Sequence, residues 1–299
     1  MEVINNTRGL LTNVITMSTT IGFIGQGWIG RHYADEFEAR MYNVVRYSLE
    51  EPFVQNKDKI ALCDVVFVAV PTPTTEQGFD DSIVKEALSL VGEGKIAVIK
   101  STLLPGTTEK MQQQFSSIFV LHSPEFLVEK TAALDAAKPK RNLVGIPVDT
   151  PKYREIAETI LRILPEAPYT KIMHSRDAEM VKYAGNCFLY SKVVFMNMLY
   201  DLSQANGCHF NELRDALIHD PRIGESHTQP AHAQGRGAGG HCFIKDFEAF
   251  RRMYETSAND PLGEAVLKAM ALLNINLLKS TNKDLDLLEG VYGKDLLPK

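Results

Sequence analysis

The chain has 299 residues, of which 44% are hydrophobic and 23% are charged, the composition of an ordinary globular protein with one or two domains. Its formal net charge of −5 provides no basic field that would attract nucleic acid or an anionic membrane. The four cysteines, at positions 63, 187, 208 and 242, form no CxxC pair. We therefore expect a reducing cytoplasm and no disulfide framework.

Short β-rich segments dominate the first half of the chain. Residues 1–17 lack a cationic segment followed by an apolar stretch, so we expect a tail there and not a signal peptide. Over residues 18–174, helical patterns separate the runs TTIGFIG, YNVVRYS, VVFVAV, IAVIK, IFVLH and NLVGI. This alternation predicts an α/β domain of the Rossmann type, with a parallel sheet covered by helices on both faces.

A glycine motif follows the first predicted strand and opens a helix. GxGxxG glycines permit a tight turn, a close approach of backbone amides to a pyrophosphate, and close packing of helix on sheet. The helix N-terminus then faces the anion. The motif predicts a dinucleotide site; the alternative is a Rossmann domain that binds a mononucleotide or nothing. The residues assigned to the cofactor are Gly25, Gln26, Gly27, Trp28, Ile29 and Gly30.

The second predicted strand decides the type of dinucleotide. An acidic residue is expected about 20 residues after the glycines, where it would bind the adenosine ribose. Ser48 stands there, followed by Glu50 and Glu51. Serine beside Arg46 would accept a 2′-phosphate, whereas the two glutamates would repel one. The sequence therefore favours NAD and leaves NADP open.

Polar residues follow three further predicted strands. Thr72 follows the third strand, Thr102 the fourth and Glu125 the fifth, with Glu129 one turn later. Ligands of an open parallel sheet bind beyond the carboxyl ends of its strands, so we expect these residues to line one crevice. For each segment taken singly, a capped loop is the simpler alternative.

Residues 175–299 predict a helical domain that begins with one long helix. The helix is about 45 Å long and apolar nearly all round, which is typical of a buried connection between domains and of a dimer core. Its stretch 188–202 is too short and too polar to span a bilayer. Lys182 and Asn186 lie four residues apart on one face. A lysine there needs a partner or a function, unless it extends to solvent from the helix end.

The segment GRGAGGHCFIKD places Cys242 between glycines and the pair Lys245–Asp246. A structural cysteine has large apolar neighbours, whereas this one has freely bending backbone on one side and charges on the other. Such surroundings are typical of a thiol that a substrate must reach; a glycine-rich turn that happens to hold a cysteine is the alternative. The nearby histidines, at positions 227, 232 and 241, fit no standard zinc spacing, so we predict no metal site.

The motifs GxGxxG, VPTP, STLLPGTT, SPEFL, KYAGN, DPRIG and GGHCFIKD occur in an order that resembles the UDP-glucose/GDP-mannose dehydrogenase family. The resemblance covers residues 20–246. It implies that the C6 hydroxyl of a nucleotide sugar is oxidised to a carboxylate in two NAD-dependent steps. UDP-glucose is the first candidate for this nucleotide sugar. A thiolate would add to the intermediate aldehyde, and water would release the acid from a thioester.

The resemblance also implies roles for single residues. Cys242 would be the nucleophile, Lys182 and Asn186 would hold the oxyanion, and Asp246 would assist Lys182 or a water. Glu125 would be the general acid/base of thioester hydrolysis, with Thr102 supporting that water. The further contacts of the cofactor would be Ser48, Thr72, Thr102, Glu129 and Lys245. Those of the nucleotide sugar would be Phe126, Leu127, Lys182, Asn186, Arg222 and Gly239.

The sequence departs from the family in three ways. His241 stands where serine is common, and Ile244 replaces a usual proline. Similar proteins add a C-terminal nucleotide-binding domain, but 53 residues follow Asp246 here (299 − 246), so we expect that domain to be absent. Two alternatives remain open: a single-step dehydrogenase of a hydroxy acid or sugar, and a catalytically impaired cofactor-binding remnant. In either case the long helix predicts a homodimer in which Arg222 reaches the other subunit's site.

Overall fold

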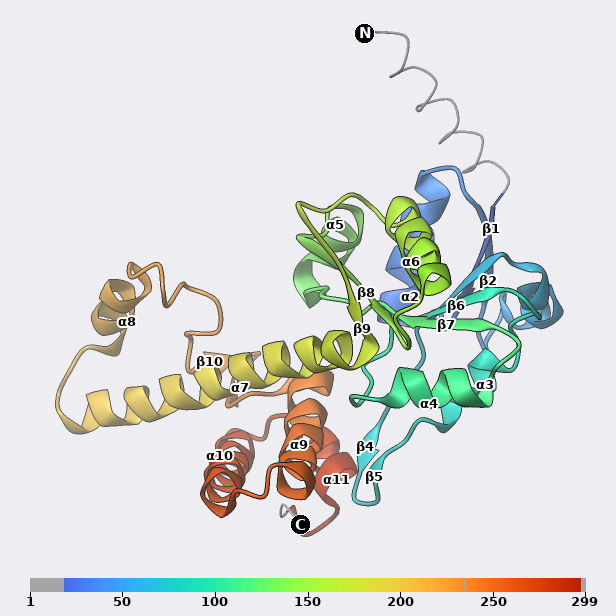
Figure 1. The fold of residues 1–299 in the computed structure, drawn as a ribbon. Coiled ribbons are helices and arrows are strands. Elements are labelled where there is room, and N and C mark those ends of the chain that lie inside the picture. The colour runs from blue at the N-terminus through green and yellow to red at the C-terminus, as the bar shows by residue number, and fades with distance from the viewer. Residues whose placement is uncertain (1–18, 234, 297–299) are drawn as a thin grey trace, which may run out of the picture. The chain divides into compact units, whose positions relative to one another are not determined.

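The computed structural model describes residues 19–233 and 235–296 (Figure 1). The expected tail, residues 1–17, lies outside the described part. The chain forms two compact units: the first comprises residues up to 72 and 81–182, and the second comprises 73–80 and the residues from 183 onward. The units meet in the sequence inside helix α7 (Ser175–Ala205), which confirms the predicted long helix.

A seven-stranded sheet forms the centre of the first unit, in the order β2-β1-β3-β6-β7-β8-β9. All pairs are parallel except β7 with β8, which meet antiparallel through His122 and Gly145. β9, an exposed edge strand, is the one strand of this sheet that we do not predict. The strands are β1 (Thr20–Ile24), β2 (Asn43–Tyr47), β3 (Val65–Val68), β6 (Ile96–Ile99), β7 (Phe119–His122), β8 (Arg141–Ile146) and β9 (Tyr169–His174).

Helices cover this sheet because each presents one apolar stripe. In α6 (Pro151–Ile163), Thr150 caps the first turn and proline occupies the first helical position; positions 153, 156, 157, 160 and 163 are buried. The rings of Phe23, Phe37 and Phe67 pack together in the core, with centroids 5.1 to 5.4 Å apart. The other helical elements are α2 (Trp28–Ala39), η1 (Val54–Leu62), α3 (Ser82–Leu88), α4 (Thr107–Gln114), η2 (Glu129–Thr131) and α5 (Ala132–Ala137).

Side chains cross-link the carboxyl ends of the strands. Ser101 Oγ donates to the carbonyl oxygen of Val70 at 2.7 Å and accepts from its N–H at 2.9 Å. Thr72 Oγ1 donates to the carbonyl oxygen of Thr102 at 2.8 Å. The segments that follow β3 and β6 are therefore held side by side at the edge where ligands bind.

The second unit is mainly helical, as predicted, and also contains two short hairpins. Its core includes the rings of Tyr190 and Phe247, which stack 3.8 Å apart. The hairpin β4–β5 is attached to α9, where Arg252 donates to the carbonyl oxygen of Thr75 at 2.6 Å. The elements are α8 (Phe210–Ile218), α9 (Gly240–Ser257), α10 (Pro261–Ser280), α11 (Leu285–Tyr292), β4 (Thr74–Thr75), β5 (Gly78–Phe79), β10 (Ala231–His232) and β11 (Gly235–Arg236).

Within the described residues, α10 is the one helix whose length and composition would allow it to cross a membrane. Core helices of soluble proteins pass the same test. One side of α10, including Ala271 and Leu278, is fully buried within the second unit.

Candidate active site

The loop between β1 and α2 has the shape of a phosphate cradle. Gly25 has φ +91°, and a Cβ there would lie 2.2 Å from the carbonyl oxygen of Ala69. A Cβ on Gly30 would lie 1.8 Å from the carbonyl oxygen of Gly25. Gly27 precedes the first turn of α2 and faces open space, with nothing within 4 Å of an added Cβ. The free space in front of this helix N-terminus fits the pyrophosphate of a dinucleotide.

The residues after β2 favour NAD. Ser48 Oγ donates to the carbonyl oxygen of Glu50 at 3.0 Å and so closes a short turn. Arg46 pairs with Asp35 at 2.7 Å and with Glu38 at 2.6 Å, and its side chain is 11% exposed. Its charge is already compensated, so the guanidinium is not available for a 2′-phosphate. Arg46 therefore does not support the binding of NADP.

Lys182 has the partner that a buried lysine needs. Its Nζ lies 2.7 Å from Glu125 Oε1, and each side chain is 7% exposed. The other carboxylate oxygen accepts from the N–H of Leu127 at 2.7 Å. In this buried ion pair each charge compensates the other, and the backbone bond fixes the carboxylate orientation. Phe126 and Leu127, the predicted substrate contacts, are half-buried beside it.

A second lysine, Lys100, lies near Glu125 and is not predicted as a site residue from the sequence. It follows β6, is 2% exposed, and donates to Ser123 Oγ at 3.1 Å. Its Nζ lies 4.3 Å from the centre of the Tyr33 ring. Burial lowers the pKa of Lys100 to about 7, and the charge of Glu125 opposes that shift. The signal available in the sequence was a lysine that ends the apolar run IAVI.

His122, the last residue of β7, is also buried. Burial and then the charge of Lys100 lower its pKa to about 3, so its imidazole is neutral at physiological pH. A neutral histidine adds no charge beside the Lys100 ammonium.

Glu179 fixes α7 to the loop that carries Thr102. Its fully buried carboxylate accepts from the N–H groups of Gly106 and Thr108, at 2.6 and 2.7 Å, and from the Thr108 hydroxyl at 2.6 Å. Burial raises the pKa of Glu179 to about 7 although these donors favour the charged form. Glu179 precedes Lys182 by three residues on the same helix and was not predicted. It therefore helps to set where Lys182 lies.

In the second unit, Cys242 occupies the first turn of α9 and is exposed. The sequence predicts a thiol that a substrate can reach, with a glycine-rich turn as the alternative, and the structure places Cys242 at a helix N-terminus. The helix dipole favours a thiolate at such a position.

Asp246 lies one turn after Cys242 and is completely buried. Its two oxygens accept from Lys245 Nζ at 2.5 Å and from Asn186 Nδ2 at 2.6 Å. Asn186 is thereby held in one orientation, and its amide carries a second N–H donor. Lys245 is bound to Asp246; its predicted contact with the cofactor stays a prediction.

The glycine segment before α9 is packed, and the expectation that its backbone bends freely is wrong. Asn274 accepts from the N–H of Ala238 at 2.7 Å and donates to its carbonyl oxygen at 2.9 Å. The N–H of Gly240 donates to Asp284 at 2.7 Å. A Cβ on Gly239 would lie 2.0 Å from Asp284 Oδ2. Glycine is required here because side chains of α10 and the segment after it fill the space.

The remaining predicted residues lie as follows. Arg222 is exposed and pairs with Asp220 at 2.6 Å. Lys192 of α7 donates to the carbonyl oxygens of Ile223 and Gly224, and so holds the segment that carries Arg222. The side chain of Glu129 lies outside the described residues. Within the part of the chain that the structure describes, no group of His, Cys, Asp and Glu side chains could hold a metal ion.

These features define a class: a Rossmann-type dinucleotide-binding protein of the dehydrogenase kind, with an added helical unit. Residues 38–164 match the NAD binding domain of the UDP-glucose/GDP-mannose dehydrogenase family, and residues 176–274 match its central domain. The chain belongs to this family, and its cofactor is NAD.

Known relatives agree with this assignment. A putative UDP-glucose 6-dehydrogenase of Bacillus subtilis is 30% identical over 207 residues, 65% of this chain and 47% of that protein. The UDP-glucose 6-dehydrogenase of Pseudomonas aeruginosa is 30% identical over 72% of this chain and 49% of its own length. The chain thus spans about half the length of the curated relatives it matches. A UDP-glucose dehydrogenase structure from Pyrobaculum islandicum superposes with a TM-score of 0.73 at 27% identity, covering 89% of this chain and 71% of that one.

Proposed function

We propose that the protein oxidises the C6 hydroxyl of a nucleotide sugar to a carboxylate, with UDP-glucose as the first candidate substrate. The observation that carries this proposal is the exposed thiol of Cys242 on the first turn of α9, one turn before the buried Asp246. A dehydrogenase that stops at an aldehyde or ketone needs no such thiol. The names of the curated relatives support the choice of UDP-glucose.

Each proposed residue has a chemical task. NAD, when bound, supplies the hydride acceptor for both oxidations. The Cys242 thiolate forms a bond to the aldehyde carbon, and the carbonyl electron pair becomes an alkoxide that Lys182 and Asn186 stabilise. After oxidation to the thioester, Glu125 takes a proton from water as the water oxygen attacks the acyl carbon. The C–S bond then breaks, and its electron pair regenerates the thiolate.

Supporting residues complete the proposed site. Asp246 orients the Asn186 amide through their 2.6 Å hydrogen bond. Thr102, whose carbonyl oxygen is fixed by Thr72, supports the hydrolytic water. Assistance of Lys182 by Asp246 stays part of the same proposal.

Product stoichiometry tests this function. Purified protein is incubated with excess NAD and a limiting amount of UDP-glucose or GDP-mannose, and NADH is measured at completion. Two NADH per sugar, with a uronic acid as product, support the proposal. One NADH per sugar favours a single-step dehydrogenase. Tight NAD binding without turnover of either nucleotide sugar favours the cofactor-binding remnant.

We also infer that the protein is a homodimer built on α7. Within the second unit, this helix exposes Phe188, Phe195, Met198 and Leu202, with exposed fractions of 55 to 71%. Their spacing of seven, three and four residues places them on one stripe of the helix. A two-fold axis lets such a stripe pack against its own copy and removes it from water.

Light scattering at micromolar concentration tests the dimer. The wild type and Leu262→Glu, which changes an exposed leucine on α10, should have the dimer mass. Phe195→Glu should shift the mass toward the monomer. A monomeric wild type would contradict the dimer and with it any shared role of Arg222.

A further inference from the structure

Residues 281–284 form the turn between α10 and α11 in the second unit, and none of the proposed roles uses them (Figure 1). This turn binds the backbone of the glycine segment that precedes α9. Thr281 Oγ1 accepts from the N–H of Arg236 at 3.0 Å, and Lys283 Nζ donates to the carbonyl oxygen of Gly237 at 3.0 Å. The partners are 45 and 46 positions apart in the chain, so a distant turn fixes this segment.

Lys283 fits against the glycine segment along its whole side chain. It is 9% exposed. An added Cβ on Gly235 would lie 2.7 Å from Lys283 Cβ, and one on Gly239 would lie 2.7 Å from Lys283 Cε. The aliphatic part of the side chain therefore occupies space that these two glycines leave, and the ammonium binds Gly237. Burial lowers the pKa of Lys283, and the charge of Asp284 opposes that shift.

Asp284 immediately precedes α11, but its carboxylate binds the N-terminus of a different helix. Among the residues that the structure describes, its side chain forms no capping hydrogen bond with α11. Its Oδ2 accepts from the N–H of Gly240, the first residue of α9, at 2.7 Å. Gly239, which precedes α9, has no side chain for this task. Asp284 therefore supplies the acceptor that Gly239 lacks, from a position 44 residues further along the chain.

The backbone of Asp284 is in the left-handed region, with φ +52° and ψ +37°. A residue with a side chain adopts this region uncommonly, and asparagine and aspartate do so more often than most. Such conformations persist where the surrounding contacts determine them, and they cluster at functional sites. The contact that accompanies this one is the hydrogen bond to the N-terminus of α9.

The later turns of α9 are held by contacts of their own. Ile244 is buried in a cluster with residues of α10 and α11, and the Phe247 ring stacks on Tyr190. Cys242 precedes both residues and is exposed. The first turn of α9 thus carries the thiol, and its N-terminal end is the part that the 281–284 turn binds.

We propose that Lys283 and Asp284 are positioning residues for Cys242, because they fix the backbone from which the thiol extends. Displacing a reacting group by about 1 Å can slow a reaction about a hundredfold. This inference rests on the proposed function for the task of the thiol. In that function the first hydride transfer, from the alcohol, does not use the thiol, whereas the second follows its addition to the aldehyde. Loss of positioning should therefore slow the second transfer selectively.

Substitutions of Asp284 test this selectivity. Asp284→Gly removes the carboxylate, and glycine adopts φ +52° without steric cost. Asp284→Asn keeps an oxygen acceptor and also tolerates this backbone conformation. Asn282→Gly is the matched control, because Asn282 is exposed and has the same φ in the same turn.

The two hydride transfers are measured separately by rapid mixing with NAD. UDP-glucose reports the first transfer, and its C6 aldehyde, supplied as substrate, reports the second. We expect Asp284→Gly to slow the second transfer about 10-fold to 100-fold and to change the first less than about twofold. Asp284→Asn and Asn282→Gly should stay within about threefold of the wild type in both transfers.

Lys283→Met tests the second positioning residue. Methionine keeps most of the aliphatic side chain and removes the ammonium that binds Gly237. We expect the second transfer to slow about threefold to tenfold, less than in Asp284→Gly, because Gly237 lies further from Cys242 along the chain. Lys279→Met, which changes an exposed lysine in the last turn of α10, is the control and should match the wild type.

A nitroxide label on Cys242 reports the order of the first turn without turnover. The label is attached in a Cys208→Ser background, since Cys63 and Cys187 are buried. In electron paramagnetic resonance spectra, Asp284→Gly should make the nitroxide more mobile. Asp284→Asn and Asn282→Gly should leave the spectrum unchanged. Circular dichroism checks that all the variants are folded.

The outcomes separate this role from the proposed function. Equal slowing of both transfers in Asp284→Gly, or an unchanged second transfer, would overturn the positioning role. An unchanged nitroxide spectrum in Asp284→Gly would overturn it too, even if the wild type makes two NADH per sugar. A more mobile nitroxide in a protein that makes one NADH per sugar, or none, would support the positioning of Cys242 and contradict the proposed function.

Discussion

Two glycine-rich segments lead into helices in this protein, and they use glycine differently. The segment from Gly25 to Gly30 leaves open space in front of α2, where an added Cβ at Gly27 would meet nothing. The segment from Gly235 to Gly240 is filled by side chains, and its N–H groups bind Asn274 and Asp284. In the first segment the missing side chain of glycine leaves space for a ligand. In the second segment other side chains of the protein fill that space. A run of glycines before a helix does not identify a phosphate loop without this distinction.

The largest effect should follow from removing the thiol that the second segment positions. Cys242→Ser should lower uronic acid formation by about a thousandfold or more, because serine at this position lacks an ionised nucleophile. NAD affinity should stay within about twofold of the wild type. Cys208→Ser, which changes an exposed cysteine three residues after the end of α7, is the matched control and should retain full activity. Two NADH per sugar from the Cys242 variant would rule out the covalent mechanism.

Substitutions in the first segment should lower NAD affinity, which the Cys242 variant leaves unchanged. Gly30→Ala places a Cβ 1.8 Å from the carbonyl oxygen of Gly25, so the backbone must move. We expect a loss of about 2–4 kcal/mol in the free energy of unfolding, and NAD affinity lowered more than tenfold. Denaturant titration and NAD titration measure the two effects.

Gly27→Ala separates binding from stability in the same loop. Its φ of −70° suits any residue and its surroundings are empty, so stability should change by less than about 1 kcal/mol. NAD affinity should nevertheless fall about tenfold, because the methyl group occupies the space for the phosphates. Unchanged NAD affinity would place the pyrophosphate elsewhere.

The packing of the second segment can be tested at Asn274. Asn274→Ala leaves the buried N–H and carbonyl of Ala238 without their side-chain partner, which should cost about 2–3 kcal/mol in unfolding free energy. NAD affinity should not change. Asn206→Ala, which removes an exposed bond at the end of α7, should cost less than about 0.5 kcal/mol. Equal costs for the two variants would show that the glycine segment is not held by Asn274.

The smallest effect, counted per pH unit, concerns pH. The pKa of Lys100 is about 7 in the folded protein, below the usual value, so above pH 7 the unfolded chain binds more protons than the folded one. Stability should therefore gain from this group as pH rises from about 7 toward 10, by at most about 1.4 kcal/mol per pH unit, and lose that gain as pH falls. Lys100→Met should flatten this dependence and stabilise the protein below pH 7. The free energy of unfolding of the wild type and of Lys100→Met is measured from about pH 6.5 to 9. Parallel pH dependences of the two would contradict the prediction.

Residues whose roles depend on neighbours in the sequence could be predicted well. The six sheet strands β1, β2, β3, β6, β7 and β8 follow from apolar runs separated by helical patterns, and α7 follows from its length and apolar character. The glycines of the predicted cofactor loop and the exposed Cys242 could be selected because their signals lie within a few residues. Lys182 was selected because a lysine on a buried helix demands a partner, and the structure supplies Glu125, 57 positions away.

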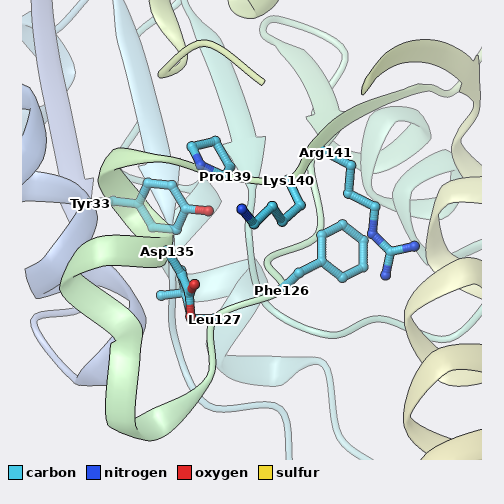
Figure 2. A pocket seen from close by; sticks show the side chains of 7 residues that line it. All are labelled: Tyr33, Phe126, Leu127, Asp135, Pro139, Lys140 and Arg141. Atoms are coloured by element: carbon cyan, nitrogen blue, oxygen red, sulfur yellow. The ribbon is translucent and has the colours of Figure 1, made fainter. Parts of the chain in front are cut away.

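Residues whose surroundings come from distant parts of the chain could not be predicted. In the sequence, Lys100 looks like the polar end of a strand, but in the structure it contacts Tyr33 and Ser123. Glu179 looks like a surface acid, but its carboxylate accepts hydrogen bonds from the N-terminus of α4. In the sequence, Lys140 and Arg141 look like part of a charged loop, but in the structure they line a cavity together with Tyr33 of α2 and Asp135 of α5 (Figure 2).

The sequence by itself therefore determined the alternation of strands and helices, the long α7 helix, the family and the chemical types at the site, because periodicity and motif spacing are local properties. The tertiary structure alone decided which charges are buried and paired. It also decided which glycines face open space and which face side chains, and which way the β8 strand runs. Burial and pairing depend on contacts between segments far apart in the chain, and no local pattern records those contacts.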